Sequence, residues 1–265
     1  MNRRKRTTSN RTIGLEPTAK AAQKRLRSFA SAQQAAILSR FFKSGPGQYG
    51  EGDRFIGVKV PMTRTVAKEF KNLPLGEVEC LLHSDIHEER LLALVILVGQ
   101  FEKGDDAIKR QIYDLYHANT RFINNWDLVD LSAPQIVGGH LQNRSRRPLD
   151  RLAKSASLWE RRISILATFS FIRQGDFADT IKIAKKLVGD KEDLIHKAVG
   201  WMLREVGKRD VAVVEEFLGR HCRVMPRTML RYAIARLSEG KRRKYLDGRV
   251  RAGKSNGHAR LQNDA

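Results

Sequence analysis

A short pattern recurs along the chain, in which a basic residue is followed by an apolar run. The pattern appears in ERLLALVIL, RRISILATF, HKAVGWMLREV and LRYAIARL, and its basic residues are Arg90, Arg162, Lys197 and Arg231. These positions lie 72, 35 and 34 residues apart, and the first interval is about twice the others. A repeat of about 35 residues is typical of α-solenoids, whose helix pairs bury their apolar faces by stacking. The repeat therefore predicts an all-α solenoid of HEAT-like antiparallel helix pairs.

Helical periodicity covers most of the chain, and no run alternates with a period of two, so we expect no sheet. Residues 28–240 are predicted to form one HEAT-like repeat domain. Residues 1–27 and 241–265 are charged and are predicted to be a disordered basic arm and tail. The expected helices are 28–43, 62–70, 75–83, 86–101, 105–118, 124–138, 148–155, 158–173, 177–187, 192–206, 211–221 and 226–238.

The net charge of +21 predicts a polyanionic partner, either nucleic acid or an anionic surface. Residues 1–27 carry +8 and residues 241–265 carry +6, which leaves +7 for the middle of the chain. No stretch has the roughly 20 apolar residues of a membrane span, so no membrane partner is expected. Stacked repeats would place the four basic residues of the pattern as a ladder on a curved, basic concave face. Alternatively, each of them pairs with an acidic residue such as Glu89 or Glu160.

The cysteines and histidines do not predict a metal site. Cys80 and Cys222 are far apart, and lone cysteines of this kind are expected to be buried in a protein of a reducing compartment. His83 and His87 lie four residues apart, but no cysteine pair accompanies them. We expect these histidines to form an exposed helix edge.

The stretch RFINNWDLVDLSAPQIVGG, residues 121–139, carries the most unusual helical pattern. Trp126 and Asp130 lie four residues apart, so a helix places them on one face. A carboxylate beside an indole in apolar surroundings is costly to desolvate unless a cation pairs with it. One interpretation is a pocket that receives a cation. The other is a core tryptophan, with Asp127 or Asp130 capping the helix or pairing with an arginine.

Three segments in order, INNWDLVDLSA, SLWERRISIL and IHKAVGWMLREVGK, resemble the DNA alkylation repair enzyme family, the HEAT-like alkylpurine DNA glycosylases. GQYGEGDRFIGVKVP resembles the family's N-terminal region. The resemblance covers residues 28–240 and implies an all-α protein that binds duplex DNA in its concave face. It further implies excision of purines alkylated at N3 or N7, without metal or cofactor and without base flipping. A monomer is expected, in the cytoplasm and associated with the nucleoid if the source is bacterial.

The resemblance also implies the site residues. Asp130 matches the catalytic aspartate, and Trp126 and Trp201 match the flanking tryptophans. The site arginine, which would hold a phosphate, matches Arg162, or Arg161 beside it. Such a carboxylate would stabilise the positive charge that develops on the deoxyribose, and aromatic faces would add cation–π attraction.

Other residues receive weaker assignments. Asp127 is expected to be structural and Trp159 to be packing. Two functional hypotheses stay open besides the glycosylase: a non-catalytic HEAT-like binder of damaged or branched DNA, and a protein scaffold, which the charge disfavours. Further DNA contacts are predicted for Lys197, Arg231, Arg90, Tyr49 and Lys59.

Overall fold

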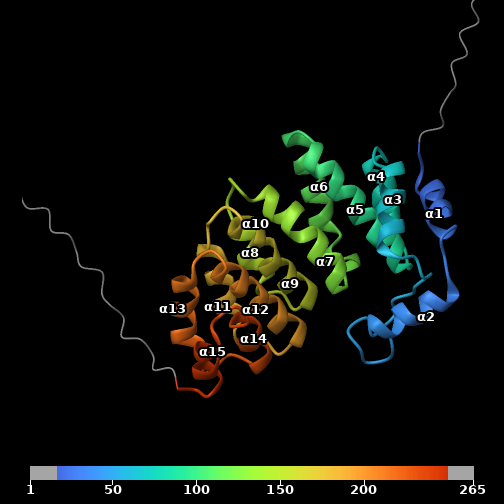
Figure 1. Ribbon diagram of the computed structural model, residues 1–265. Helices are drawn as coiled ribbons and strands as arrows, with labels where there is room; N and C mark the ends of the chain where they lie inside the picture. Colours follow the sequence, from blue (N-terminus) through green and yellow to red (C-terminus); the bar gives the residue numbers. More distant parts are fainter. Residues whose placement is uncertain (1–16, 250–265) are drawn as a thin grey trace, which may run out of the picture.

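The computed structural model describes residues 17–249, which form helices joined by short connections (Figure 1). Within this range the β-type pairing is a single isolated bridge between Arg54 and Ile86. The all-helical prediction is therefore confirmed. The α-helices are α1 (Ala19–Arg27), α2 (Ala32–Phe41), α3 (Val60–Glu69), α4 (Leu75–Leu82), α5 (His87–Lys103), α6 (Asp106–Ala118), α7 (Trp126–Ala133), α8 (Arg147–Leu152), α9 (Leu158–Ala167), α10 (Phe169–Ile172), α11 (Ala178–Leu187), α12 (Asp193–Gly207), α13 (Val211–His221), α14 (Arg227–Ala233) and α15 (Glu239–Leu246).

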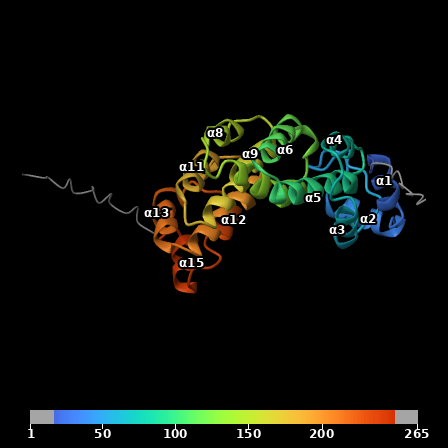
Figure 2. The same ribbon diagram turned by 90° about the horizontal axis from the view of Figure 1, so that it is seen from above.

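One row of helices runs through the molecule. Helix α3 packs on α5, α5 on α7, α7 on α9, α9 on α12 and α12 on α14. Helices α4 and α6 pack on α5, and α11 and α13 pack on α12, so a second set covers the first. The elements follow one another from α1 at one end to α13 and α15 at the other (Figure 2). This is the arrangement of an α-solenoid, while a curved face of basic character stays a prediction.

The predicted ends of the ordered domain are wrong on both sides. Helix α1 lies inside the predicted arm, and its residues Ala19, Ala22 and Leu26 are buried. They form a narrow apolar stripe among lysines and arginines, which composition alone hides. Helix α15 lies mostly inside the predicted tail and buries Tyr245. The remaining arm and tail residues, 1–16 and 250–265, lie outside the described residues.

The predicted helix 124–138 is divided by a proline. Asn125 caps α7, its side-chain oxygen accepting the N–H of Trp126, and the α-helix ends at Ala133. Pro134 has no N–H to donate to the carbonyl of Asp130, and a π-helical turn η2 (Pro134–Gly138) follows. A Cβ at Gly138 would lie 2.2 Å from the carbonyl oxygen of Ala167. The turn therefore lies very close to the end of α9, which brings α7 and α9 together.

Two expectations about cysteine and histidine burial are also wrong. Cys80 is exposed, and Cys222, just after the end of α13, is half-buried against the core. His87 is buried instead of lying at an exposed edge, because two carboxylates hold its ring. Between residues 17 and 249, no helix combines the length and the apolar character needed to cross a membrane.

Candidate active site

A cavity of about 470 Å³ opens where α7, α9, α12 and α14 meet the end of α2. It brings together residues that are up to 191 positions apart in the sequence, from Phe41 to Tyr232. Most of its lining residues are aromatic or charged. The lining residues are Phe41, Lys43, Tyr49, Trp126, Asp130, Arg162, Glu192, Asp193, Leu194, Lys197, Trp201 and Tyr232.

An ion pair between α7 and α9 lies on the cavity wall. Arg162 donates from Nε to Oδ1 of Asp130 and from Nη2 to Oδ2, each at 2.8 Å. Its third nitrogen donates to the carbonyl of Leu194 at the start of α12. The guanidinium is 5% exposed and the carboxylate 18% exposed. Planar bidentate pairing of this kind fixes the orientation of the carboxylate as well as its charge.

Within the protein, Arg162 donates twice to Asp130 and once to the carbonyl of Leu194. A contact of its remaining N–H groups with a phosphate stays a prediction. Burial raises the pKa of Asp130 above its ordinary value of 3.8, and the positive charge of Arg162 opposes this rise. Arg162 therefore favours the ionised carboxylate in a place where burial favours the neutral acid.

Hydrogen bonds hold the two tryptophans of the site in place. The indole N–H of Trp126 donates to the hydroxyl of Tyr49 at 3.2 Å, and that of Trp201 donates to Glu205 at 3.0 Å. Phe42 stacks on Trp126 with ring centroids 5.3 Å apart. Both indoles are half-buried and line the cavity, so neither is fully enclosed in the hydrophobic core. Each presents an aromatic surface to any group that enters.

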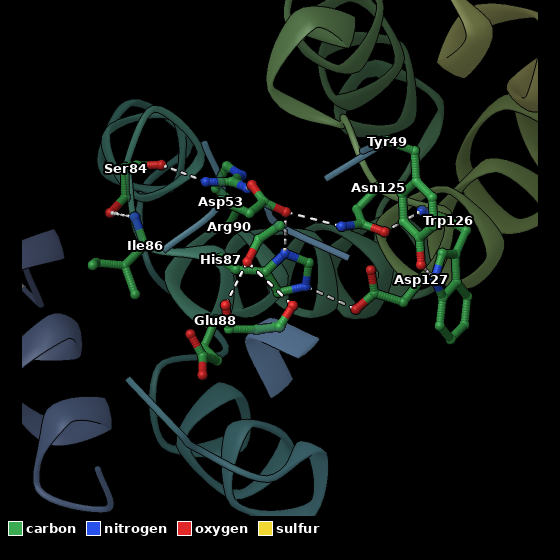
Figure 3. Close-up of polar contacts among 12 residues, drawn as sticks. Tyr49, Asp53, Ser84, Ile86, His87, Glu88, Arg90, Asn125, Trp126 and Asp127 are labelled. Atoms are coloured by element: carbon green, nitrogen blue, oxygen red, sulfur yellow. Dashed lines mark hydrogen bonds and ion pairs between the residues drawn. The ribbon is translucent and has the colours of Figure 1, made fainter. Parts of the chain in front are cut away.

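A buried charge cluster anchors the first turn of α7, which carries Trp126 (Figure 3). His87 donates from Nδ1 to Asp53 at 3.0 Å and from Nε2 to Asp127 at 2.9 Å. Arg90 also pairs with Asp53, and Asn125 donates to it at 2.9 Å. The cluster thus joins the loop before α3 to α5 and to the first turn of α7. Asp127 has the structural role that was predicted for it.

The cluster predicts a dependence of stability on pH. Burial by itself lowers the pKa of His87, but the hydrogen bonds that its ring donates to Asp127 and Asp53, together with their negative charges, outweigh burial and raise the pKa from 6.5 to about 9. The stabilisation is therefore complete below pH 6.5 and is lost as the pH rises through about 9. The free energy of unfolding should fall by about 3 kcal/mol over this interval, since each pH unit between the two pKa values corresponds to about 1.4 kcal/mol. Urea unfolding at several pH values measures it, and a His87→Gln variant that keeps the same slope would contradict the assignment.

Some of the predicted site residues line the cavity and the others do not. Asp130, Trp126, Trp201, Arg162, Lys197 and Tyr49 all line the cavity. Lys197 also pairs with Asp193 at 2.7 Å, one turn away on α12. Of the two adjacent arginines, Arg162 faces Asp130, whereas Arg161 pairs with Asp190 and with two backbone carbonyls.

The predicted ladder of basic residues does not form as one face. Its helices α5, α9, α12 and α14 do belong to one row, but Arg90 is 4% exposed and is held by Asp53 and the carbonyl of Ser84. The pairing alternative holds for Lys197, whose partner Asp193 lies on the same helix, but Arg90 and Arg162 pair with Asp53 and Asp130 on other segments, not with Glu89 or Glu160. Arg231 is exposed and makes no ion pair within residues 17–249, whereas its neighbour Tyr232 lines the cavity. Lys59 is exposed at the start of α3, away from the cavity lining.

Sequence reasoning missed several residues of the cavity. Adjacent Phe41 and Phe42 cannot both lie on one face of a helix, which is a signal that one of them points outward. Glu192 and Asp193, at the start of α12, and Tyr232 on α14 carry no such signal, because only the stacking of distant helices brings them to Asp130.

The geometry is suited to a positively charged guest. The carboxylate of Asp130, oriented by Arg162, lines the cavity together with the indoles of Trp126 and Trp201. The other charges of the lining balance, with Glu192 and Asp193 against Lys43 and Lys197. Aromatic faces and carboxylates both attract cations, and a partly buried setting strengthens this attraction. Trp159, expected to be packing, is half-buried and meets Tyr49 edge to face at 6.3 Å.

Comparisons with known proteins agree with this description. The sequence matches the family model described as DNA alkylation repair enzyme over residues 22–237. Curated protein sequences give no significant match. A solved structure described as a predicted DNA alkylation repair enzyme from Enterococcus faecalis is similar, with 18% identity and a TM-score of 0.62 over 79% of this chain and 97% of that one. At this identity the structural likeness supports the fold alone. Because the family model spans most of the described helices, the chain belongs to the DNA alkylation repair enzyme family.

Proposed function

We propose that this protein is a DNA glycosylase that excises cationic N3- and N7-alkylated purines from duplex DNA. The observation that carries the proposal is the Asp130 carboxylate, oriented by Arg162 in a cavity that Trp126 and Trp201 also line. A protein that only grips phosphates needs cations and gains nothing from a carboxylate in its binding cavity, because like charges repel. A carboxylate held ionised beside aromatic faces fits a cationic substrate.

The proposed reaction follows from the charge of the lesion. Alkylation at N3 or N7 makes the purine a cation, so the bond from C1′ to the base breaks and the base leaves as a neutral molecule with the bonding electron pair. Positive charge then develops on the deoxyribose, as in the hydrolysis of glycosides. Asp130 stabilises this charge and orients a water, whose oxygen bonds to C1′ and whose proton is released. Because the leaving group is already activated, the base requires no proton from an acid.

Other features of the proposal concern how the DNA is held. The indoles of Trp126 and Trp201 would lie against the cationic nucleotide, each contributing about 0.5–2 kcal/mol of cation–π attraction. Lys197 and Arg231 would contact phosphates, which positions the strand without reading its sequence. We propose that the protein acts as a monomer, without base flipping and without a metal, so excision should continue in the presence of a chelator.

The direct test measures the release of 7-methylguanine and 3-methyladenine from a methylated duplex. The reaction buffer contains a chelator, and the released bases are quantified by chromatography. The proposal expects release of both bases above the spontaneous rate, and none from an unmethylated duplex. A folded protein that binds methylated duplex but releases no base would instead be a non-catalytic binder of damaged DNA.

A further inference from the structure

An exposed aromatic ring lies at the edge of the cavity. Phe41, the last residue of α2, is 60% exposed, whereas Phe42 beside it is 7% exposed. Phe42 does the packing here, because its ring lies against Trp126, Phe55 and His87. Phe41 lines the cavity and meets Trp126 edge to face, with centroids 5.9 Å apart and ring planes at 70°. The hydrophobic core therefore makes little use of the Phe41 ring.

Two glycines allow loop backbone to pack closely against the two ends of α2, the helix that carries this ring. Gly57 has a φ of 81°, and a Cβ there would lie 2.0 Å from the carbonyl oxygen of Ser31, the residue that caps α2. A Cβ at Gly50 would lie 2.4 Å from the carbonyl oxygen of Phe42. Both ends of α2 thus lie against loop backbone at positions where a larger residue does not fit.

The loop in turn is anchored to α5. Glu88 is buried and accepts the backbone N–H groups of Ile56, Gly57 and Val58, the middle one at 2.8 Å. A carboxylate that accepts several backbone donors holds a loop firmly. The exposed ring at the end of α2 is therefore presented to the cavity by a fixed support.

The kind of occupant is argued from Asp130 and the aromatic rings. The other charges of the lining balance, because Lys197 pairs with Asp193 and Lys43 and Glu192 are of opposite sign. Asp130 supplies a largely buried carboxylate, and Trp126 and Trp201 supply aromatic surfaces. An aromatic ring attracts a cation that lies over its face within about 6 Å of its centroid. We propose that Phe41 is a specificity residue whose ring contacts the positively charged alkylated nucleotide and favours it over undamaged DNA. This inference rests on the glycosylase function proposed above.

The test compares substitutions at Phe41 with a control on the same helix. Phe41→Leu keeps an apolar side chain and removes the aromatic face, and Phe41→Trp keeps an aromatic face. Ile37 lies one turn earlier, is 44% exposed and does not line the cavity, so Ile37→Ala controls for loss of exposed apolar surface. The release of 7-methylguanine by each variant is measured as a kcat/KM value, and the affinities for methylated and unmethylated duplex are measured in parallel.

Phe41→Leu should lower kcat/KM by about 3- to 30-fold and leave affinity for unmethylated duplex unchanged. Phe41→Trp and Ile37→Ala should behave like the wild type, and all three should keep the wild-type unfolding midpoint. Unchanged excision by Phe41→Leu in an active protein overturns this inference alone, as does an equal loss of affinity for methylated and unmethylated duplex. A wild-type protein that releases no base overturns the proposed function, and this inference with it.

Discussion

Asp130→Asn is expected to lower alkylpurine excision by about 100- to 1,000-fold, the loss seen when one group that stabilises transition-state charge is removed. The amide has nearly the shape of the carboxylate and its oxygen still accepts one hydrogen bond from Arg162, but its NH2 group cannot accept the second and the negative charge is gone. Affinity for duplex DNA should be kept or slightly increased, because a charge that repels phosphates is gone. Single-turnover release of 7-methylguanine, with binding measured in parallel, separates the two effects.

Asp193→Asn is the matched control for this variant. Asp193 lines the same cavity and pairs with Lys197, but its carboxylate is 56% exposed. Solvent screens such a charge strongly, so excision by this variant should stay close to that of the wild type. Equal losses in the two variants would mean that the summed charge of the cavity matters and that Asp130 has no special place.

Arg162→Leu is expected to lower both stability and excision. Breaking a buried ion pair leaves an uncompensated charge and costs about 3–5 kcal/mol. Asp130 can reduce this cost by binding a proton, because burial already raises its pKa and Arg162 is the largest opposing cause. Without Arg162 that pKa rises further, so excision should fall at neutral pH and partly recover as the pH is raised. Urea unfolding and the pH profile of kcat/KM measure the two effects.

Arg161→Leu is the control for the arginine experiment. Arg161 precedes Arg162 and pairs with Asp190, whose carboxylate is 7% exposed, so its loss should also destabilise the protein. It should not move the acid side of the pH profile. The double variant Asp130→Asn with Arg162→Leu should be less destabilised than Arg162→Leu alone, because no buried carboxylate is left unpaired. Strictly additive changes in the free energy of unfolding would show that the two side chains do not interact.

Much of the fold could be predicted because its information is local. The spacing of Arg162, Lys197 and Arg231 reports the repeat, and Trp126 and Asp130 share a face by helical geometry alone. The pairing of Arg90 could not be found in this way, since its partner Asp53 lies in a loop whose position depends on tertiary contacts. The early start of the domain was missed because α1 buries only small or isolated apolar residues.

The site shows the same division. Its tryptophans and its aspartate were identified by resemblance, and the structure places them around one cavity. Pairing of Asp130 with an arginine was one of the two interpretations of the stretch, but that this arginine is Arg162 was not predicted, because a sequence does not show which way a guanidinium points. Local pairing on one helix and contact with DNA were both reasonable expectations. The stacking of α7 on α9 rules out the first by placing the Asp130 carboxylate in front of the guanidinium.

The positions of the tryptophans also allow intrinsic fluorescence to report on the cavity. The chain has three tryptophans, of which Trp126 and Trp201 line the cavity and Trp159 lies against Tyr49 at its edge. Any guest that stacks on an indole or excludes water from it will alter the fluorescence of a large share of the emitting groups. Titrations and stopped-flow traces can therefore follow occupancy of the cavity in the native, unlabelled chain, and single Trp→Phe variants can show which wall responds first.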